Sequence, residues 1–460
     1  MSEQLLVVGA GPAGMAAAQS AWENGIKDIV LLEREQKAGG ILNQCIHDGF
    51  GLVQFGEMIS GPEYANRVAE ALKKTDVRIF LDTMVTELRR DKTVTAVSRR
   101  GVETFHPEAI VLSTGCRERT RGAIAIPGTR PAGIYTAGVA QNLVNCRNIA
   151  IGQEIVILGA GDIGLIMARR LTLEGAKVRC VIELQAEPGG LQRNISQCLY
   201  DFGIPLYTRH TVTEIQGRER LKGVVISAVD DADHPIPGTE KQISCDTLIL
   251  SVGLIPENEL AQKAGILLDP HSNGVRTADT LETNIEGIFS CGNSRAVLDL
   301  ADYVTCEGAL AGANAARYIK GEPLVIAGQK GSNRMAKGRP KEGDITCILC
   351  PNGCCLSWND GKISGNRCNR GKEFAEEERK CPSRSVTTVL LVEDGTLLPV
   401  RTSCRIPKEK VFLVVQFCKR QVLRRSCHSG DVLYANVEGT GADLIAGTDW
   451  LARPESHCAW

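Results

Sequence analysis

The sequence predicts an α/β protein in which two similar three-layer domains are followed by a smaller, cysteine-rich α+β domain. Two observations lead to this prediction. A glycine pattern that follows a short apolar run occurs twice, at a constant offset of 150 residues. Ten of the 18 cysteines lie after residue 340, which sets the last quarter of the chain apart chemically. The length of 460 residues also exceeds what one hydrophobic core organises, so several domains are expected.

The bulk composition is that of a soluble, globular chain. Hydrophobic residues make up 43% and charged residues 23%, which are ordinary values. The net charge of -1 gives no electrostatic basis for binding nucleic acid. No window approaches the run of about 20 apolar residues that spans a bilayer. The apolar N-terminus is interrupted by glycines and lacks a basic leader, so we expect a buried strand and helix there, and a cytoplasmic protein without direct membrane insertion.

Each copy of the repeat opens with a G-x-G-x-x-G fingerprint. The apolar runs Leu5–Val8 and Ile155–Leu158 precede the two fingerprints and suit the centre of a parallel sheet. The first glycine permits a tight turn, the second lets a pyrophosphate approach the backbone, and the third lets helix and strand pack closely. The following helix presents free N–H groups and a partial positive charge to phosphates. The glycines are Gly9, Gly11 and Gly14 in the first copy and Gly159, Gly161 and Gly164 in the second.

An acidic residue completes each fingerprint. Glu33 and Glu183 each lie 19 residues after the third glycine, at the end of the next apolar strand. A carboxylate there accepts hydrogen bonds from both ribose hydroxyls and repels a 2′-phosphate, so the second site is expected to prefer NAD(H) over NADP(H). Glycines with only turn and packing roles are the alternative interpretation, which two complete fingerprints in register disfavour. The fingerprint itself leaves open which copy binds which dinucleotide.

The repeat and its surroundings resemble the two-dinucleotide-domain flavoproteins, which are FAD- and NAD(P)-dependent pyridine nucleotide oxidoreductases and include thioredoxin-reductase-like and NADH-dependent reductases. Three further segments match the family, namely Val111–Arg119, Leu248–Leu260 and Ile288–Asn293. The resemblance implies FAD at the first fingerprint and NAD(H) at the second, each on a Rossmann-like domain. It also implies the domain limits: an FAD domain of residues 1–120 and 254–322, with an NAD domain of residues 121–253 inserted in it.

The resemblance implies which residues contact the two dinucleotides. Asn293 stands where many members carry an aspartate against the flavin ribityl chain, and its amide can still hydrogen-bond a hydroxyl. A helix over residues 303–319 is rich in small residues that suit close packing beside the flavin. The residues expected at FAD are Gly9, Gly11, Gly14, Glu33, Arg34, Gly40, Gly115, Gly292 and Asn293. Those expected at NAD(H) are Gly159, Gly161, Gly164, Glu183 and Gly253.

One departure separates the chain from thioredoxin reductases, which carry a CxxC pair in the NAD domain. No CxxC occurs before residue 347, so disulfide reduction is not the expected chemistry. The segment Gly39–Gly51 instead resembles the branch that includes electron-transfer subunits of anaerobic glycerol-3-phosphate, opine and proline dehydrogenases. Cys45 and His47 lie in this segment and could act near the flavin ring, although a structural role is the stronger interpretation. Hydride transfer needs no protein acid or base, so no catalytic side chain is nominated.

A cysteine motif opens the tail, residues 344–460, after a polar and basic stretch at 323–343 that is expected to be a linker. The motif is CxxCxxxC, then a fourth cysteine after thirteen intervening residues. Clustered thiolates repel each other unless a cation neutralises them, and four of them suit a [4Fe–4S] cluster or a zinc ion. Spacings of two and three residues favour iron–sulfur. The expected ligands are Cys347, Cys350, Cys354 and Cys368, and Cys355 or Cys381 could replace one of them.

The rest of the tail predicts small elements. A hairpin is expected with its turn at Asp394–Gly395, and a short helix is expected after Pro407. Most of residues 344–448 is similar to a small CxxCPxGC domain that accompanies anaerobic glycerol-3-phosphate dehydrogenase-like flavoproteins, either as a separate subunit or fused.

These parts together predict an electron-transfer flavoprotein. NADH supplies two electrons as a hydride, iron–sulfur clusters pass one electron at a time, and flavin does both. The main hypothesis is a subunit that passes electrons between NAD(H), FAD and the cluster for a separate FAD-dependent, glycerol-3-phosphate dehydrogenase-like partner that acts on a hydroxy acid or a related substrate. One alternative is a self-sufficient NADH-dependent reductase of a small acceptor. Another makes the tail a structural zinc module that docks a partner. An oligomer is compatible with each hypothesis.

Overall fold

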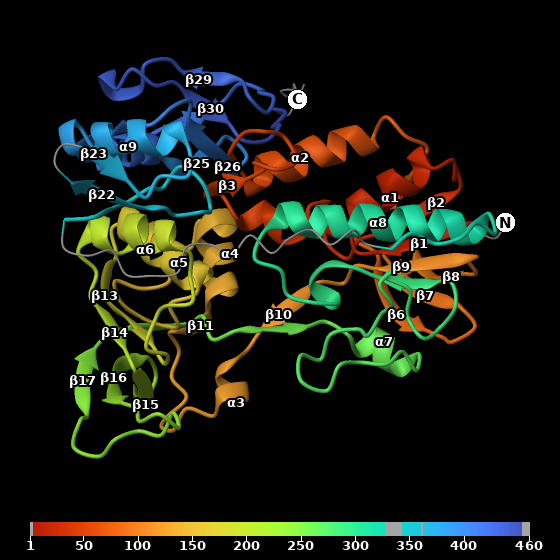
Figure 1. Cartoon of the computed structure of the whole chain (residues 1–460), viewed down its shortest axis with the longest axis horizontal. Coiled ribbons are helices and arrows are strands. Elements are labelled where there is room, and N and C mark those ends of the chain that lie inside the picture. The colour runs from red at the N-terminus through yellow and green to blue at the C-terminus, as the bar shows by residue number, and fades with distance from the viewer. Residues whose placement is uncertain (1–2, 327–342, 360–361, 453–460) are drawn as a thin grey trace, which may run out of the picture. The chain divides into compact units, whose positions relative to one another are not determined.

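The computed structural model describes residues 3–326, 343–359 and 362–452 (Figure 1). These residues divide into two compact units. The first unit holds the chain up to Arg117 and resumes at Leu254, and the second holds Glu118–Gly253 together with the described residues from 343 onward. The inserted segment and the C-terminal domain therefore belong to one unit. Most of the expected linker and the last eight residues of the chain lie outside the described residues.

A parallel five-stranded sheet lies at the centre of the first unit, in the order β20-β9-β1-β2-β5. A three-stranded antiparallel sheet has the order β6-β7-β8, and β3 pairs with β4. The strands are β1 (Leu5–Val8), β2 (Ile29–Leu32), β3 (Asp48–Phe50), β4 (Ile59–Ser60), β5 (Arg78–Phe80), β6 (Met84–Leu88), β7 (Val94–Ser98), β8 (Gly101–Phe105), β9 (Ala109–Leu112) and β20 (Ile288–Ser290). The helices are α1 (Pro12–Glu23), α2 (Gly61–Leu72), α7 (Glu259–Lys263) and α8 (Ala301–Ile319), with the 3-10 segments η1 (Gly40–Gln44) and η3 (Gly292–Ser294).

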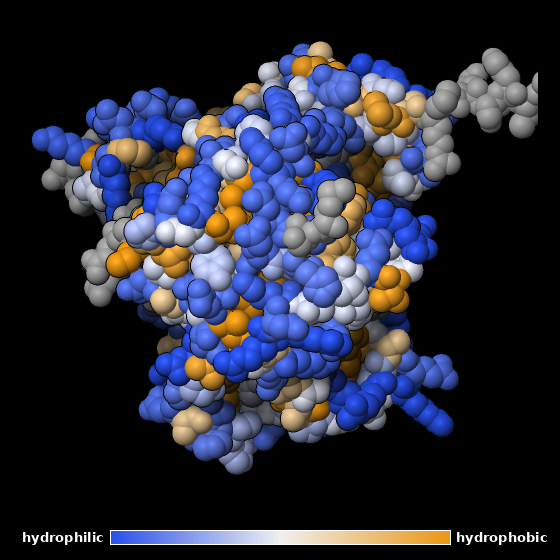
Figure 2. Space-filling model, turned by 90° about the vertical axis from the view of Figure 1, so that its right-hand side faces the viewer, coloured by the Kyte–Doolittle hydropathy of each residue, from blue (hydrophilic) through white to orange (hydrophobic). Residues whose placement is uncertain are grey.

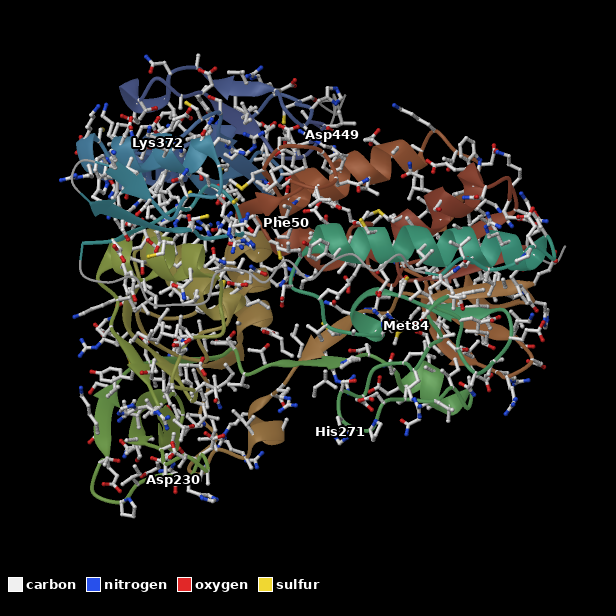
Figure 3. The ribbon with its side chains drawn as sticks, viewed as in Figure 1. Phe50, Met84, Asp230, His271, Lys372 and Asp449 are labelled. Carbon is white, nitrogen blue, oxygen red and sulfur yellow. The ribbon has the colours of Figure 1, made fainter. Side chains whose placement is uncertain are left out.

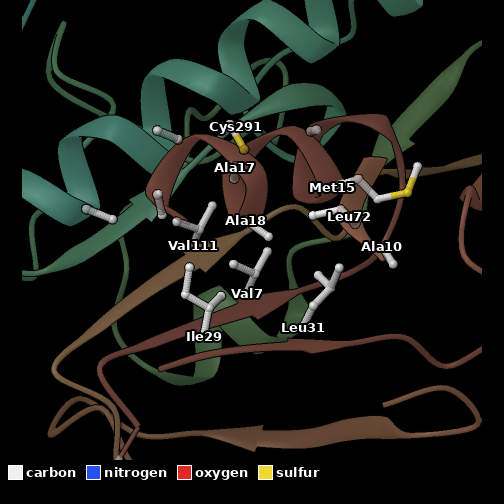
Figure 4. Packing of buried hydrophobic residues seen from close by; sticks show 14 of the residues in the cluster. Val7, Ala10, Met15, Ala17, Ala18, Ile29, Leu31, Leu72, Val111 and Cys291 are labelled. Atoms are coloured by element: carbon white, nitrogen blue, oxygen red, sulfur yellow. The ribbon is translucent and has the colours of Figure 1, made fainter. Parts of the chain in front are cut away.

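Alternate residues of the parallel strands fill two separate cores. Val7 and Leu31 pack with side chains of α1, α2 and α8 on one face of the sheet (Figure 4). Val8 and Leu32 pack with the antiparallel sheet on the other face. Successive strand residues point to opposite faces, so a sheet covered on both sides needs the continuously apolar runs seen in the sequence. The predicted three-layer α/β fold class is confirmed.

Helix α8 approaches α1 closely because two glycines face it. A Cβ on Gly308 would lie 2.1 Å from the carbonyl oxygen of Ala13, and one on Gly312 would lie 2.0 Å from that of Ala17. The glycines are four residues apart and therefore share one face of α8. The helix expected over residues 303–319 is confirmed as part of α8. Gly312 was expected to allow packing beside the flavin, whereas the structure uses it for contact with α1.

The inserted segment repeats the architecture of the first unit strand by strand. Its parallel sheet has the order β11-β18-β12-β13-β14, and its antiparallel sheet has the order β15-β16-β17. Setting β12 against β1 and β18 against β9 aligns the two sheets completely, so the sequence repeat extends to the whole domain. The strands are β11 (Ile134–Thr136), β12 (Glu154–Leu158), β13 (Lys177–Glu183), β14 (Leu206–Thr208), β15 (His210–Gly217), β16 (Leu221–Ala228), β17 (Lys241–Ser244) and β18 (Thr247–Leu250). The helices are α3 (Arg121–Ile124), α4 (Ala137–Arg147), α5 (Asp162–Leu173), α6 (Gln192–Cys198) and η2 (Tyr200–Phe202), and the connecting strands β10 (Cys116–Glu118) and β19 (Leu254–Pro256) pair with each other.

The C-terminal domain is built on a five-stranded sheet in the order β28-β25-β26-β30-β29. The predicted hairpin is confirmed, because β25 pairs with β26 in antiparallel register around Asp394–Gly395. The predicted helix after Pro407 begins as the 3-10 segment η4 and continues as α10. The strands are β21 (Ile345–Thr346), β22 (Cys355–Asn359), β23 (Lys362–Ser364), β24 (Ser383–Arg384), β25 (Thr387–Val392), β26 (Leu397–Thr402), β27 (Ile406–Pro407), β28 (Val422–Leu423), β29 (Val432–Tyr434) and β30 (Leu444–Ala446). The helices are α9 (Asn369–Lys380), η4 (Lys408–Lys410), α10 (Val411–Arg420) and η5 (Val437–Gly439).

The C-terminal domain packs against the inserted domain within the second unit. Leu173, at the end of α5, joins the apolar core of the C-terminal domain. Arg384 crosses between the domains and donates to Asp201 in η2 and to Glu378 in α9. The ammonium group of Lys408 lies 2.7 Å from the Asp201 carboxylate. A basic stretch of chain was expected to tether this domain, but the domain is also held by a buried charge network.

The described surface is mainly hydrophilic. On the face drawn in Figure 2, apolar side chains lie in small groups among polar ones. Helix α9 illustrates the pattern, since Lys372 is exposed whereas Phe374 and Ala375 are buried (Figure 3). Within the described ranges, no helix combines the length and the hydrophobicity needed to cross a bilayer.

Candidate functional site: two dinucleotide turns and a cysteine loop

The first glycine turn, between β1 and α1, is closed on the protein side and open on the other. A Cβ on Gly9 would lie 2.6 Å from the carbonyl oxygen of Ser113, and one on Gly14 would lie 1.8 Å from that of Gly9. A Cβ on Gly11 would meet nothing within 4 Å. Gly9 and Gly14 therefore permit the turn, and Gly11 leaves open backbone at the N-terminus of α1, where an anion binds favourably.

The second turn, between β12 and α5, has the same construction. A Cβ on Gly159 would lie 2.0 Å from the carbonyl oxygen of Ser251, and one on Gly164 would lie 2.3 Å from that of Gly159. A Cβ on Gly161 would again meet nothing within 4 Å. Two independently folded turns thus present the same open concavity to a pyrophosphate.

Sequence analysis missed the serines that close these turns. The Ser113 hydroxyl donates to the carbonyl oxygens of Val8 and Gly9 at 2.8 and 2.9 Å. Ser251 takes the corresponding place in the second copy, as the contacts of Gly159 and Gly164 show. The signal was present in the sequence, because both serines begin an S-x-G triplet directly after a buried strand.

Both fingerprint acids are positioned by backbone N–H groups. Glu33 accepts from the N–H of Ala10 at 2.8 Å through Oε2 and from that of Glu35 at 2.9 Å through Oε1. Glu183 accepts from the N–H of Ala160 at 2.8 Å and from that of Gln185 at 3.0 Å. A carboxylate offers about four lone-pair positions. Each acid therefore keeps capacity for ribose hydroxyls while its orientation is already set.

The remaining residues expected at FAD surround the first turn and the end of β20. A Cβ on Gly40, which has a φ of +55°, would lie 3.1 Å from the Cα of Gly11. Gly115 has a φ of +72° and open space beside it. The half-exposed guanidinium of Arg34 lies 3.9 Å from the carboxylate of Glu257. The N–H of Gly292 donates to the carboxylate of Glu307 at 2.6 Å, an interaction that the sequence did not signal.

Asn293 uses its amide within the protein. Its Oδ1 accepts from the N–H of Leu298 at 3.0 Å, and its Nδ2 lies 3.5 Å from the sulfur of Cys116. The neighbouring Glu307 pairs with Arg295. The amide orientation is therefore set before any ligand binds, with donor capacity remaining on Nδ2.

Cys45 and His47 lie in a closely packed segment of the first unit. The carbonyl oxygen of Cys45 accepts from the N–H of Gly61 at 2.9 Å, and the ring of His47 lies 5.0 Å from that of Phe50. Asp302 holds the following loop by accepting from the N–H of Gly51 at 3.2 Å, among other backbone groups. Burial raises the pKa of Asp302. These contacts agree with structural roles for Cys45 and His47.

Gly253 ends the second S-x-G triplet with a φ of +107°, and its carbonyl oxygen accepts from the N–H of Arg119 at 2.9 Å. The lone cysteines of the inserted domain, Cys180 and Cys198, are both buried. Burial raises the pKa of each to about 12, so both thiols are protonated and poorly nucleophilic at neutral pH.

The four cysteines expected to bind metal gather at one end of α9. Cys347 is 4% exposed, Cys354 is buried, and Cys368 is the exposed N-cap residue of α9. Burial raises the pKa of Cys347, the N–H of Leu349 bonded to its sulfur opposes this, and the thiols of the other three cysteines raise the pKa further. A thiolate quartet of this kind suits a cation and soft-metal ligation. Among the described residues, however, no group of three or more His, Cys, Asp or Glu side chains already has metal-binding geometry.

The two candidate substitute ligands have other surroundings. The thiol of Cys355 lies 3.4 Å from a carboxylate oxygen of Asp344. Cys381 follows the C-terminal end of α9, whereas Cys368 precedes its first residue. Twelve helical residues separate the two cysteines by about 18 Å. Cys381 therefore cannot replace Cys368 beside Cys347 while α9 is intact.

Comparisons with known proteins agree with the two-turn geometry. The family model described as "Pyridine nucleotide-disulphide oxidoreductase" matches residues 3–316, more than half of the chain. A second model, described as "Protein of unknown function (DUF1667)", matches residues 369–448. This second match begins directly after Cys368, so it contains none of the four expected metal ligands.

Individual relatives are distant. Thioredoxin reductase of Listeria monocytogenes is 26% identical over 69% of this chain and 93% of its own length. An opine oxidase subunit from Agrobacterium tumefaciens is 28% identical over 57% of this chain, and the match spans only 54% of that protein. The crystal structure of T. acidophilum thioredoxin reductase has a TM-score of 0.56 at 21% identity, covering 69% of this chain and 98% of that one. From the matched family and the shared fold, the chain belongs to the pyridine nucleotide-disulphide oxidoreductase family, which is flavin-dependent and binds FAD and NAD(P)H.

Proposed function

We propose that the chain is an electron-transfer subunit that exchanges electrons with NADH through bound FAD and passes them by way of a C-terminal iron–sulfur cluster. Its partner would be a separate FAD-dependent dehydrogenase of the glycerol-3-phosphate dehydrogenase type, acting on a hydroxy acid or a related small substrate. One observation carries the proposal: two open glycine turns of the same construction occur in a chain that also gathers four thiols at one helix end.

FAD is assigned to the first turn. Gly11 and the N-terminus of α1 would receive the pyrophosphate, and Glu33 would accept hydrogen bonds from the adenosine ribose. Gly292 and Asn293, at the end of β20, offer polar groups to the rest of the cofactor, and the other contacts proposed for FAD are Gly9, Gly14, Arg34, Gly40 and Gly115. Bound FAD would supply the ability to take up electrons in pairs and to release them singly.

NADH is assigned to the second turn. Gly161 leaves the same open backbone, with Gly159, Gly164 and Gly253 shaping the turn. Glu183 is already oriented by two backbone N–H groups, so its free lone pairs can bind both ribose hydroxyls without rearrangement. The same charge repels a 2′-phosphate. We therefore assign NADH rather than NADPH to this site.

The cysteine quartet is assigned to a [4Fe–4S] cluster. Cys347, Cys350 and Cys354 would supply three thiolates from one loop, and Cys368 would supply the fourth from the N-terminus of α9. The helix dipole stabilises negative charge at that position. The N–H of Leu349, which is bonded to the sulfur of Cys347, can stabilise a cluster thiolate in the same way.

A subunit role is supported by the kind of relative that the chain matches. The opine-specific match is, by its name, one subunit of an oxidase. The cysteines of the inserted domain are buried and far from the thiolate state, which argues against a dithiol acceptor. The chain therefore needs an electron donor or acceptor beyond its own thiols, and a dehydrogenase partner meets that need.

Anaerobic purification of the full chain tests the assignment. We expect flavin absorbance, iron and sulfide in the protein, and an EPR signal after reduction. Cys368→Ser should lower iron content and the signal, whereas Cys404→Ser, at an exposed cysteine of the same domain with no assigned role, should leave both unchanged. Full iron content in Cys368→Ser refutes the ligand set. Zinc without iron supports the structural module, and sustained NADH oxidation by the isolated chain with a small acceptor supports a self-sufficient reductase.

A further inference from the structure

The two dinucleotide turns differ at the residue that opens each helix. Pro12 opens α1, whereas Asp162 opens α5 directly after Gly161. The Oδ1 atom of Asp162 accepts from the N–H of Leu191 at 2.7 Å and from Nδ2 of Asn194 at 2.8 Å. Both residues belong to the start of α6. The second turn is therefore bonded to α6 by a side chain that the first turn lacks.

The next residues of α6 contact the cysteine loop. Gly353 lies between Cys350 and Cys354 and has a φ of +54°. A Cβ on Gly353 would lie 3.1 Å from the Cβ of Gln192 and 3.3 Å from the backbone N of Arg193. Contacts this tight transmit displacement, because packed protein interiors are nearly incompressible. A shift of α6 must therefore move the loop or be resisted by it.

Helix α5 supplies a second connection between the turn and the C-terminal domain. Its first residue is Asp162, and its far end reaches that domain. Nη2 of Arg169 donates to the carbonyl oxygen of Ser385 at 3.0 Å, and Nη1 of Arg170 lies 3.1 Å from the hydroxyl of Thr388. The dinucleotide turn is thus joined to the C-terminal domain both directly along α5 and through α6.

We propose that Asp162 is a positioning residue that couples dinucleotide binding at the second turn to the conformation of the Cys350–Cys354 loop. The proposal rests on the assignment of the second turn to NADH and of the loop to metal. Linkage makes the effect reciprocal: if the bound dinucleotide orders the loop, a metal held by the loop strengthens dinucleotide binding by the same factor. Such couplings are typically about 5- to 150-fold. A relay of a few hydrogen bonds belongs at the lower end, at about 5- to 10-fold.

Hydrogen exchange of the full-length, metal-free chain with ADP-ribose tests the coupling without electron transfer. ADP-ribose carries the pyrophosphate and both riboses but no nicotinamide, so it cannot donate a hydride. We expect saturating ADP-ribose to slow exchange of the amides of residues 347–354 about 5- to 10-fold. Protection of the first amides of α5 reports saturation independently in every variant.

Two pairs of variants separate coupling from general destabilisation. Asp162→Ala should remove loop protection even when α5 is saturated, and Asp162→Asn, which keeps an acceptor oxygen, should retain most of it. Gly353→Ala should also remove the protection, because its methyl group meets Gln192 and Arg193. Gly395→Ala is the matched control, since Gly395 has a φ of +83° in the same domain with nothing within 4 Å of a Cβ.

The outcomes distinguish this inference from the proposed function. Loop amides that exchange at an unchanged rate while α5 is protected would overturn the coupling. Loop protection that survives in Asp162→Ala would overturn the role of Asp162, and Gly353→Ala decides the matter if Asp162→Ala does not fold. A chain that binds neither iron nor zinc defeats the proposed cluster, yet the exchange result stands on its own. In metal-loaded protein, the NADH dissociation constant should be about 5- to 10-fold lower than in metal-free protein.

Discussion

Replacing Arg384 with leucine should loosen the C-terminal domain from the inserted domain. The guanidinium makes four hydrogen bonds to the carboxylates of Asp201 and Glu378, at 2.5 to 2.9 Å. The side chains of Arg384 and Asp201 are only 6% and 9% exposed. Removing one partner of a buried ion pair costs roughly 3 to 5 kcal/mol, because the other charge stays in a low-dielectric interior. Lys408 remains beside Asp201, so we expect a loss at the lower end, about 3 kcal/mol.

Urea-dependent hydrogen exchange measures this loss for each domain separately. Amides of β25 and β26 should exchange through an opening that is about 3 kcal/mol easier in Arg384→Leu than in the wild-type chain. Arg179→Leu is the control, because the pair between Arg179 and Glu154 is about two-fifths exposed at both ends. An exposed pair contributes about 0 to 1 kcal/mol, so that variant should change little.

Two results would refute the reasoning about Arg384. One is an opening free energy in Arg384→Leu that changes no more than in Arg179→Leu. The other is strict additivity of Arg384→Leu and Asp201→Leu. Removing both partners leaves fewer uncompensated charges, so the double variant should lose less than the sum of the single losses.

Gly11→Ala should leave the fold stable and abolish flavin retention, because its methyl group enters space that is open in the protein and assigned to pyrophosphate; Gly14→Ala should instead unfold the first unit, because its methyl group would lie 1.8 Å from a carbonyl oxygen. Thermal unfolding and flavin absorbance separate the two. Glu183→Ala should raise the NADH dissociation constant about 10-fold, the loss of one hydrogen bond to a charged group, and reduce discrimination against NADPH in the same titration. Burial alone would raise the pKa of Asp201, but its bonds to Arg384 hold the pKa below the ordinary value. The stability from this shift is present above a pH of about 3.9 and is lost as the pH falls through the folded pKa, so Asp201→Asn should flatten that part of an acid unfolding curve.

The sequence was sufficient for the two parallel sheets because their signals are local. Gly9 and Gly159 each sit where a Cβ would strike a serine carbonyl, and such steric requirements leave a fixed spacing of glycines in the chain. The buried strands also need continuously apolar runs, since both of their faces are covered. The cysteine spacing likewise identified the thiols that gather around Cys347, because three of the four lie within one short loop.

The contacts that hold the C-terminal domain left no comparable signal. Asp201 and Arg384 meet across 183 residues of sequence, and neither belongs to a motif. Glu307 at the N–H of Gly292 and Asp302 at the loop after β3 depend on where α8 packs, which no local pattern encodes. The composition of residues 323–343 predicted a tether, but composition carries no information about a docking surface formed by distant side chains.

The position of the C-terminal domain can be understood from the way the two copies differ. In the first copy, α8 has 19 residues and covers the 12-residue α1, with glycines at the contact. Its counterpart α4 follows β11 in the second copy and has only 11 residues, about 16 Å, against a helix α5 of about 18 Å. Arg170 near the end of α5 bonds to Asn145 of α4 and to Thr388 of β25. The C-terminal domain therefore buries the part of α5 that a longer α4 would cover, which explains why it belongs to the same unit as the inserted domain.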